Sequence, residues 1–520
     1  MTERLAGVAI PLFSLRRPAG MDTGCGGIGD LPLALQLFLR FGHRLIQLLP
    51  LDEVAPGQSS PYSSLSVLAI DPIYVALEGL SRAELRRAVR PHLRRRGRAP
   101  YAGSVDRERA RVVKSRYLVR EYRRFRAAGT PSERARFEAY AEANRSWLAD
   151  YALFRALKER FGWSAWEKWP APLRRHDADA LSAARSELAD SVSMHCYWQF
   201  VAAEQWRRVR QRFADAGAFL GGDIAFSPAR DSAEVWANQD LFDLERSVGA
   251  PPDAFSDKGQ RWGLPMPNWE RMRARNFDLL RLRAEKAAER FDVIRIDHVV
   301  GLYRTYSVGP NPDETGHFEP ADEPAQRRQG EEVLRAIQES ARGATVIAED
   351  LGVVPDWVRE SLAACSIAGY KVVRWEKSNR GLPDEGYIDP QIYPELSVAT
   401  TGTHDTECLV EWWRTQPERE RTMFVKGLRI AERLAPERQP LDTLGLDAIL
   451  EALYAAPSHL AIVPVQDLFG WRTRINLPAT LSQANWSFRL PMALERMLED
   501  GSAARRAAQL CAIVERTGRR

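Results

Sequence analysis

The sequence is poor in cysteine and has no long apolar run, and each absence excludes a class of protein. Its 520 residues include five cysteines, an odd number, and no two of them have C-x-x-C spacing. We therefore expect neither a secreted disulfide framework nor a zinc ribbon. No run approaches the roughly 18–20 apolar residues of a membrane-spanning helix, and no basic-then-apolar leader opens the chain. These absences predict a cytoplasmic protein with no membrane contact.

An excess of charge of either sign is also missing. Lysine and arginine total 74 against 69 acidic residues, and the net charge of +5 is small for this length. A strongly basic chain would point to nucleic acid, so this balance predicts no nucleic-acid partner. The arginine cluster at 94–98 is short, and we interpret it as a solvated segment. Hydrophobic residues, in contrast, make up 45% of the chain, which is enough for a large core.

Short apolar runs recur along the chain and alternate with helical stretches. Near-continuous apolar runs are typical of parallel strands that are buried on both faces. Eight such strands predict an α/β fold, a (β/α)8 TIM barrel that spans 1–520 as a single catalytic domain. The long helical segment between the second and third runs predicts an inserted, mostly helical subdomain at 78–195. The runs are 6–15, 45–51, 218–226, 293–299, 345–351, 371–376, 397–405 and 461–468.

Acidic residues lie at or near the C-terminal ends of five runs, and this end is the active-site face of such a barrel. Three of them belong to distinctive motifs: R-I-D-H around Asp297, A-E-D-L-G around Glu349 and T-G-T-H-D around Asp405. Because the motifs come from different strands, we expect their carboxylates to converge on one pocket. Alternation along the strand puts Arg295 and Asp297 on one face, which favours an ionised Asp297. The acids are Asp223, Asp297, Glu349, Asp405 and Asp467.

Converging carboxylates are the arrangement that glycoside chemistry requires. A retaining reaction uses one carboxylate as the nucleophile and one carboxylic acid as the proton donor. Neighbouring acids raise the pKa of the donor, which fits it for proton transfer near neutral pH. A metal-dependent barrel hydrolase is an alternative, because Asp, Glu and His are also metal ligands. Adjacent residues on a strand point to opposite faces, however, so each Asp-His or Glu-Asp pair supplies only one inward ligand.

Further motifs occur in a fixed order along nearly the whole chain. They read G-I-G-D at 27–30, S-P-Y at 60–62, Y-W-Q-F at 197–200, D-S-A-E-V-W at 231–236, G-Q-R-W-G at 259–263 and N-W at 485–486. Together with the three acidic motifs, this series resembles the amylomaltases or 4-α-glucanotransferases, relatives of the α-amylases. The resemblance implies transfer of α-1,4-glucan segments from a donor to the 4-hydroxyl of an acceptor glucan or glucose, with no metal and no cofactor.

The resemblance also implies a role for each matching residue. Asp297 matches the nucleophile that carries a covalent glucosyl intermediate, Glu349 matches the general acid/base, and Asp405 matches the acid that stabilises the transition state. The segment 250–270 matches a loop that covers the cleft. The residues that match substrate-binding positions are Tyr62, Asp223, Arg295, His404, Trp262 and Phe255.

The chain departs from the family pattern close to the acids, which leaves alternative functions open. Val299 and Val300 stand where the family usually has Phe-Arg, and Thr406 stands in place of an Asn. A mainly hydrolytic α-glucan-cleaving enzyme would use the same three acids, and a catalytically weak glucan-binding protein would keep the sugar contacts. Because all three acids are present, we favour an active transferase with altered sugar-binding subsites.

Overall fold

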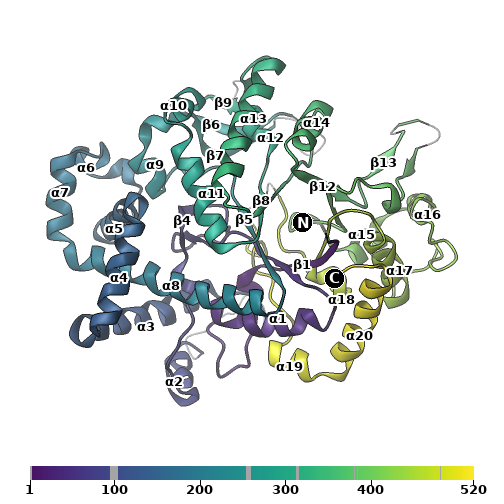
Figure 1. The fold of residues 1–520 in the computed structure, drawn as a ribbon, viewed down its shortest axis with the longest axis horizontal. Coiled ribbons are helices and arrows are strands. Elements are labelled where there is room, and N and C mark those ends of the chain that lie inside the picture. The colour runs from purple at the N-terminus through teal and green to yellow at the C-terminus, as the bar shows by residue number, and fades with distance from the viewer. Residues whose placement is uncertain are drawn as a thin grey trace.

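The structure is a computed structural model that describes residues 3–93, 103–252, 259–311, 315–379, 381–382, 385–478, 480 and 482–520. Within these residues, parallel strands close into a barrel in the order in which they occur along the chain. Figure 1 shows the barrel in the middle of the molecule, surrounded by helices, and the predicted (β/α)8 fold is confirmed. The barrel strands are β1 (Leu5–Ala9), β2 (Leu45–Gln47), β5 (Phe219–Ile224), β8 (Val293–Ile296), β11 (Thr345–Ala348), β12 (Ala368–Val372), β15 (Ser397–Thr400) and β16 (Leu460–Pro464).

Side chains on both faces of the barrel strands are buried. Val293 and Ile347 belong to a small apolar cluster that the barrel strands form among themselves. Their neighbours Ile294 and Val346 belong instead to the large core that also includes the surrounding helices. Since successive side chains of a strand point to opposite faces, burial on both faces explains why these strands are continuous apolar runs in the sequence.

The sixth barrel strand begins and ends earlier than the sequence predicts. The apolar run at 371–376 was expected to be the strand, whereas β12 spans Ala368–Val372 and residues 373–375 form a turn. Ala368 and Gly369 carry little apolar signal, so the pattern overlooks the first half of this strand. The consequence is that Arg374 lies beyond β12, at the end of the barrel where the acids lie.

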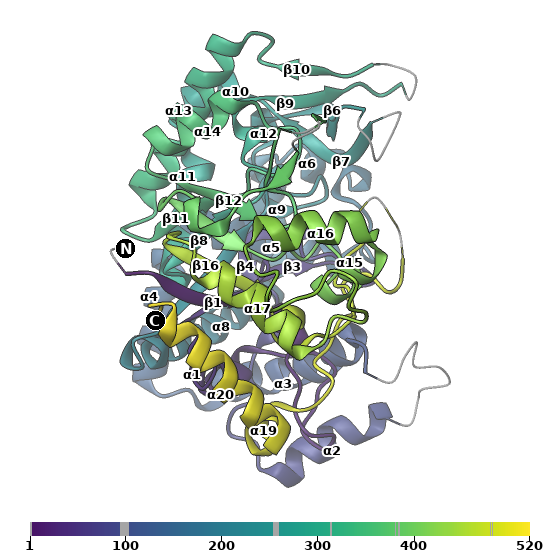
Figure 2. The ribbon, with the colours of Figure 1, turned by 90° about the vertical axis from the view of Figure 1, so that its right-hand side faces the viewer.

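Helices pack around the outside of the barrel. Each of these helices contacts the next: α1 packs on α8, α8 on α11, α11 on α13 and α13 on α14. Near the C-terminus, α17 packs on α20. Figure 2 shows α17 and α20 along one flank. No helix within the described ranges is long and apolar enough to cross a membrane. The bounds are α1 (Leu31–Leu39), α8 (Ala189–Asp215), α11 (Asp278–Arg290), α12 (Val300–Tyr303), α13 (Glu323–Ser340), α14 (Asp356–Ala364), α15 (Leu409–Thr415), α16 (Glu418–Gly427), α17 (Thr443–Tyr454), α18 (Val465–Phe469), α19 (Leu494–Glu499) and α20 (Gly501–Arg516).

The segment between β2 and β5 forms a β-hairpin followed by helices that lie beside the barrel (Figure 1). Helix α8 packs against α3, α4 and α5, and it also contacts β4 and β5 of the hairpin and barrel. The proposed subdomain limit at residue 195 falls inside α8, so the division at 78–195 remains a proposal. The bounds are β3 (Asp52–Val54), β4 (Ser64–Ile70), α2 (Arg82–Leu93), α3 (Arg107–Ala128), α4 (Pro131–Ala143), α5 (Arg145–Arg160), α6 (Ala171–Arg174) and α7 (Ala178–Glu187).

A second sheet lies over one side of the barrel, with the strand order β10-β9-β6-β7 (Figure 2). Residues 260–267, which the sequence analysis assigns to a cleft-covering loop, form the strand β7. Residues 253–258, and Phe255 with them, lie outside the described residues. The bounds are β6 (Phe242–Ala250), β7 (Gln260–Pro267), β9 (Thr305–Val308) and β10 (His317–Glu319), with α9 (Ala233–Ala237), α10 (Trp269–Ala274), β13 (Lys377–Ser378) and β14 (Gly386–Tyr387) elsewhere.

Candidate active site

The three acids stand at the C-terminal end of the barrel. Asp297 directly follows β8, and Glu349 directly follows β11. β8 and β11 are paired in parallel, with Ile296 opposite Ala348, so the two acids are neighbours at the C-terminal edge of the barrel. Both residues still make hydrogen bonds between strands, because the backbone nitrogen of Glu349 donates to the Ile296 oxygen over 2.9 Å and that of Asp297 to the Ile224 oxygen over 3.1 Å. Asp405 lies in the loop between β15 and α15.

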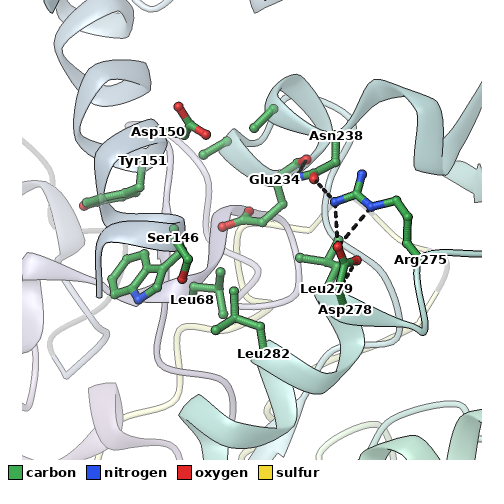
Figure 3. Close-up of a pocket in the computed structure, with 13 residues that line it drawn as sticks. Leu68, Ser146, Asp150, Tyr151, Glu234, Asn238, Arg275, Asp278, Leu279 and Leu282 are labelled. Carbon is green, nitrogen blue, oxygen red and sulfur yellow. Dashed lines mark hydrogen bonds and ion pairs between the residues drawn. The ribbon is translucent and has the colours of Figure 1, made fainter. Parts of the chain in front are cut away.

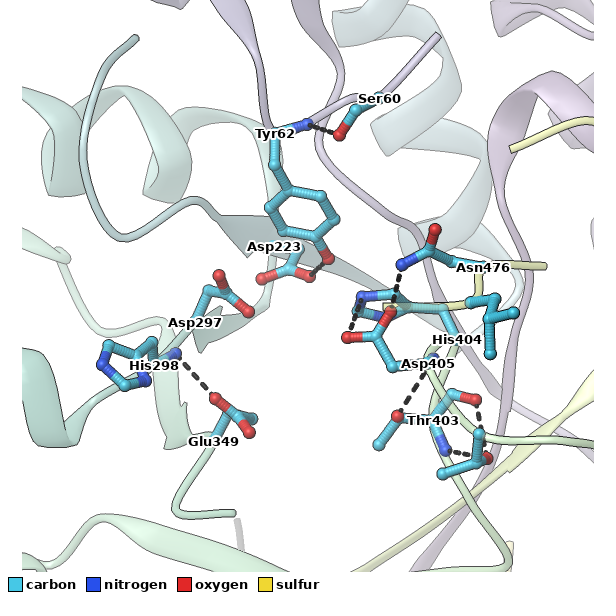
Figure 4. A network of polar contacts seen from close by, with 12 residues as sticks. Ser60, Tyr62, Asp223, Asp297, His298, Glu349, Thr403, His404, Asp405 and Asn476 are labelled. Carbon is cyan, nitrogen blue, oxygen red and sulfur yellow. Dashed lines mark hydrogen bonds and ion pairs between the residues drawn. The ribbon is translucent and has the colours of Figure 1, made fainter. Parts of the chain in front are cut away.

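These acids line one cleft of about 690 Å³, which most of the residues expected to bind sugar also line. Figure 4 shows the carboxylates of Asp223, Asp297, Glu349 and Asp405 arranged around a common space. Asp223 lies one layer deeper, in a cavity of about 40 Å³ that it shares with Arg295 and His404. The residues of the main cleft include Tyr62, Phe226, Gln260, Trp262, Arg295, Asp297, His298, Glu349, His404, Asp405, Asn476 and Trp486.

Asp297 is held by a buried network of charges. The Arg295 guanidinium donates to Asp297 over 2.9 Å and to both oxygens of Asp223 over 2.7 and 2.6 Å. The Tyr62 hydroxyl donates to the second Asp223 oxygen over 2.7 Å. Burial acts to lower the pKa of Arg295, but Asp223 and Asp297 outweigh it and raise that pKa, so the guanidinium stays charged. A fixed cation therefore lies against the Asp297 carboxylate.

Glu349 is in the opposite electrostatic situation. Burial, reinforced by the negative charges of Asp297 and Asp405, raises the pKa of Glu349 to about 8, although Arg295 acts against the shift. One carboxyl oxygen accepts the backbone N–H of His298 over 2.7 Å, which fixes the side chain beside Asp297 (Figure 4). At neutral pH Glu349 therefore carries a proton, and it lies beside the Asp297 carboxylate that Arg295 binds. A proton donor next to a carboxylate is the pairing that a retaining glycosyl transfer needs.

The raised pKa of Glu349 predicts how the activity of the enzyme falls at alkaline pH. Below about pH 8 Glu349 carries a proton and can donate it, and above that pH the proton is lost. We therefore expect kcat/KM to fall roughly tenfold per pH unit above about pH 8. In Asp297→Asn the carbon-13 resonance of the labelled Glu349 carboxyl should titrate at lower pH than in the wild type, because a repelling charge is gone. An unchanged titration would contradict this electrostatic account.

Asp405 is more open to the cleft than the other two acids, with 43% of its side chain exposed. Its carboxylate accepts the Asn476 amide over 2.6 Å, and the His404 ring nitrogen lies 3.5 Å from its other oxygen. Arg474 donates to the Asp405 backbone carbonyl. Sequence reasoning missed Asn476 and Arg474, because neither belongs to a strand-end acid motif. Only the fold brings the segment after α18 across to Asp405.

Aromatic rings form two walls of the cleft. Tyr62 stacks on His404, with ring centroids 5.3 Å apart, and both rings contact Trp486. On the other side Trp262 meets the His298 ring edge-on, with the centroids 4.8 Å apart. Burial lowers the pKa of His298 to about 4, so this ring is neutral at physiological pH. Aromatic walls of this kind suit the apolar faces of glucose rings.

The departures from the family pattern have clear places in the structure. Val299 and Val300 are buried, and neither lines the cleft. The Thr406 hydroxyl accepts the Thr403 N–H over 3.0 Å and donates to the Thr403 carbonyl, closing a turn around Asp405. Thr406 therefore contributes to the shape of this loop through its two hydrogen bonds with Thr403.

A separate pocket of about 320 Å³ lies between α5, α9 and α11 and contains none of the three acids. Figure 3 shows Arg275 on its rim, where it donates to Asn238 over 2.9 Å and to Asp278 over 2.8 Å. Glu234 accepts the Ser66 hydroxyl over 2.6 Å. Arg275, Asp278 and Asn238 thus bind one another, and Glu234 is held by a residue outside the lining, which sets this pocket apart from the acid-lined cleft.

Known proteins match this chain over most of its length. A family model described as 4-alpha-glucanotransferase matches residues 10–494. The 4-alpha-glucanotransferase of Thermus thermophilus is 33% identical over 494 residues, which cover 89% of this chain and 91% of that protein. The 4-alpha-glucanotransferase of Chlamydia caviae is 29% identical over 498 residues, covering 95% and 92%.

A solved structure agrees with these relatives. The amylomaltase of Streptococcus agalactiae in complex with acarbose superposes with a TM-score of 0.79 at 25% identity, covering 99% of this chain and all of that one. The family resemblance noted from the sequence motifs is confirmed. By the extent of these matches, the chain belongs to the 4-alpha-glucanotransferase family.

Proposed function

We propose that this enzyme transfers α-1,4-glucan segments by a retaining mechanism in which Asp297 and Glu349 act in turn. In the first half, an Asp297 oxygen bonds to C1 of the donor sugar while the bond from C1 to the bridging oxygen breaks. Glu349 gives its proton to that oxygen, so the shortened glucan leaves as an alcohol. The product of this half is a glucosyl ester on Asp297.

In the second half, the 4-hydroxyl of an acceptor glucan attacks C1 of the ester. The ester bond to Asp297 breaks, and Glu349 takes the proton of the attacking hydroxyl, which restores both side chains. Two inversions at C1 give net retention. Esterified Asp297 no longer carries the charge that raises the pKa of Glu349, so this pKa falls when a base is needed.

We assign the supporting roles to the residues around these two acids. Arg295 holds the Asp297 carboxylate ready for attack, and Asp223 and Tyr62 hold Arg295. In this proposal Asp405 and His404 bind hydroxyl groups of the sugar whose C1 reacts, and contacts that tighten in the transition state accelerate the reaction. Trp262 stacks on an acceptor sugar. We expect the reaction to need no metal or cofactor.

One observation supports this proposal above the others: a carboxylate paired with a buried guanidinium lies next to a carboxyl group with a pKa of about 8, in one cleft. Transfer rather than hydrolysis then requires that a sugar hydroxyl outcompete water for the ester. Binding energy from the acceptor acts in that direction, because it holds the hydroxyl at C1. We also propose a cytoplasmic location.

The test is incubation with maltotriose alone, with products separated by chain length. For a transferase we expect glucose together with a ladder of longer oligosaccharides and little increase in total reducing ends. Rising reducing ends without longer products would instead establish hydrolysis, and binding of maltotriose without any product would establish a glucan-binding protein. Activity that disappears with a chelator and returns with added metal would revive the metal-dependent alternative.

A further inference from the structure

Asp467, the fifth strand-end acid, lies outside the main cleft and has no part in the proposed chemistry. It follows β16 in the short helix α18, and only 1% of the residue is exposed. Its carboxylate accepts the Thr401 hydroxyl over 2.5 Å and the Leu409 backbone N–H over 2.7 Å. Thr401 begins the loop that carries His404 and Asp405, and Leu409, the first residue of α15, directly follows that loop. A buried charge is therefore directed to the two ends of that loop.

Arg374 approaches the same loop from the opposite side. It lies just beyond β12, and its guanidinium donates to the carbonyl oxygens of Thr401 and Glu407 over 2.7 and 2.8 Å. Its remaining terminal nitrogen lies 3.8 Å from an Asp467 oxygen. Both side chains are almost fully buried, so this ion pair is poorly screened by solvent.

The strand order explains how the two charges hold the loop. β15 lies between β12 and β16 in the barrel, so the loop after β15 emerges between Arg374 and Asp467. Four hydrogen bonds from this pair tie the loop at residues 401, 407 and 409. Asp405 reaches from this loop into the cleft, where Asn476 binds its carboxylate and Arg474 binds its backbone carbonyl. The position of Asp405 therefore depends on these contacts and on where the two ends of the loop are held.

From this geometry we infer that Asp467 is a positioning residue for Asp405. It acts through the loop 401–409, with Arg374 as its ionic partner, and contacts no substrate itself. The inference rests on the proposed role of Asp405 in the transition state. A carboxylate that moves even slightly loses contacts that must tighten as the sugar ring distorts, whereas ground-state binding depends on many other contacts.

The test is a double-mutant cycle with Asp467→Asn, Asp405→Asn and the combined variant, assayed with maltotriose. We expect Asp467→Asn to lower kcat by about 10- to 100-fold, as removal of an outer supporting residue does at a metal site, while KM changes by less than about threefold. The combined variant should be no slower than Asp405→Asn alone, because Asp467 has nothing left to position. Asp389→Asn is the matched control, since Asp389 also accepts a backbone N–H, from Gln391, and pairs with an arginine, Arg429, but lines neither cavity of the site.

Two outcomes would overturn the inference. The first is a wild-type kcat in Asp467→Asn. The second is a combined variant whose fall in kcat equals the product of the two single falls. Either result would show that Asp467 does not act through Asp405. Should Asp467→Asn fail to fold, Thr401→Val removes one of the two loop contacts of Asp467 and should show the same non-additivity at a smaller size. If Asp405→Asn itself kept wild-type activity, the proposed role of Asp405 would fail, and this result is distinct from a failure of the positioning role.

Discussion

Asp297→Asn is expected to lower the kcat of maltotriose disproportionation by at least about 10⁴-fold, the scale seen when a covalent nucleophile is removed. An amide is neutral and a weak nucleophile, so the glucosyl ester cannot form. The size and shape of the side chain are kept, and we expect a melting temperature close to that of the wild type. The assay follows glucose release and oligosaccharide lengths over days at high enzyme concentration.

A matched control separates this effect from any loss of a carboxylate. Asp190→Asn makes the same chemical change at a side chain that is 80% exposed, in α8 beside the barrel, and it should leave kcat unchanged. A direct measurement is to trap the intermediate of the wild type with a fluorinated glucosyl fluoride and to locate the added mass by peptide mapping. Label on a peptide without Asp297 would show that the nucleophile is misassigned.

Glu349→Gln should give the second largest effect, a fall in kcat of roughly 10²- to 10⁴-fold with maltotriose as donor. The bridging oxygen of a glucan is a poor leaving group unless it is protonated, and glutamine has no acidic proton. Fluoride leaves without a proton, so α-glucosyl fluoride should restore formation of the ester on Asp297 to near the wild-type rate. The measurement is the initial burst of fluoride release.

The dependence on the leaving group distinguishes an acid from a residue that only holds the site together. If Glu349→Gln were equally slow with fluoride and with maltotriose, Glu349 would not be the proton donor. Glu360→Gln, an amide replacement at a side chain that is 68% exposed, is the control and should behave as the wild type with both donors. A structural defect would lower the rates with both donors alike.

The barrel could be predicted from the sequence because its physical cause is local. Strands that are buried on both faces must be apolar throughout, and such runs are visible without any knowledge of the fold. The acids at the ends of the runs could be found for a similar reason, since a polar group at the end of a buried strand stands out. The first half of β12 escaped because Ala368 and Gly369 are small, so the pattern began too late.

What the sequence determined by itself was therefore the barrel, the acids at its C-terminal end and the family to which their motifs belong. Only the tertiary structure decided which side chains meet there. It places Arg295 between Asp223 and Asp297, brings Asn476 to Asp405, and directs buried Asp467 to the loop of Asp405 and away from the cleft. The physical reason is that contacts between residues far apart in the chain depend on strand order and register, which no local pattern records. The pKa of Glu349 follows from the same contacts, because burial and neighbouring charges exist only after folding.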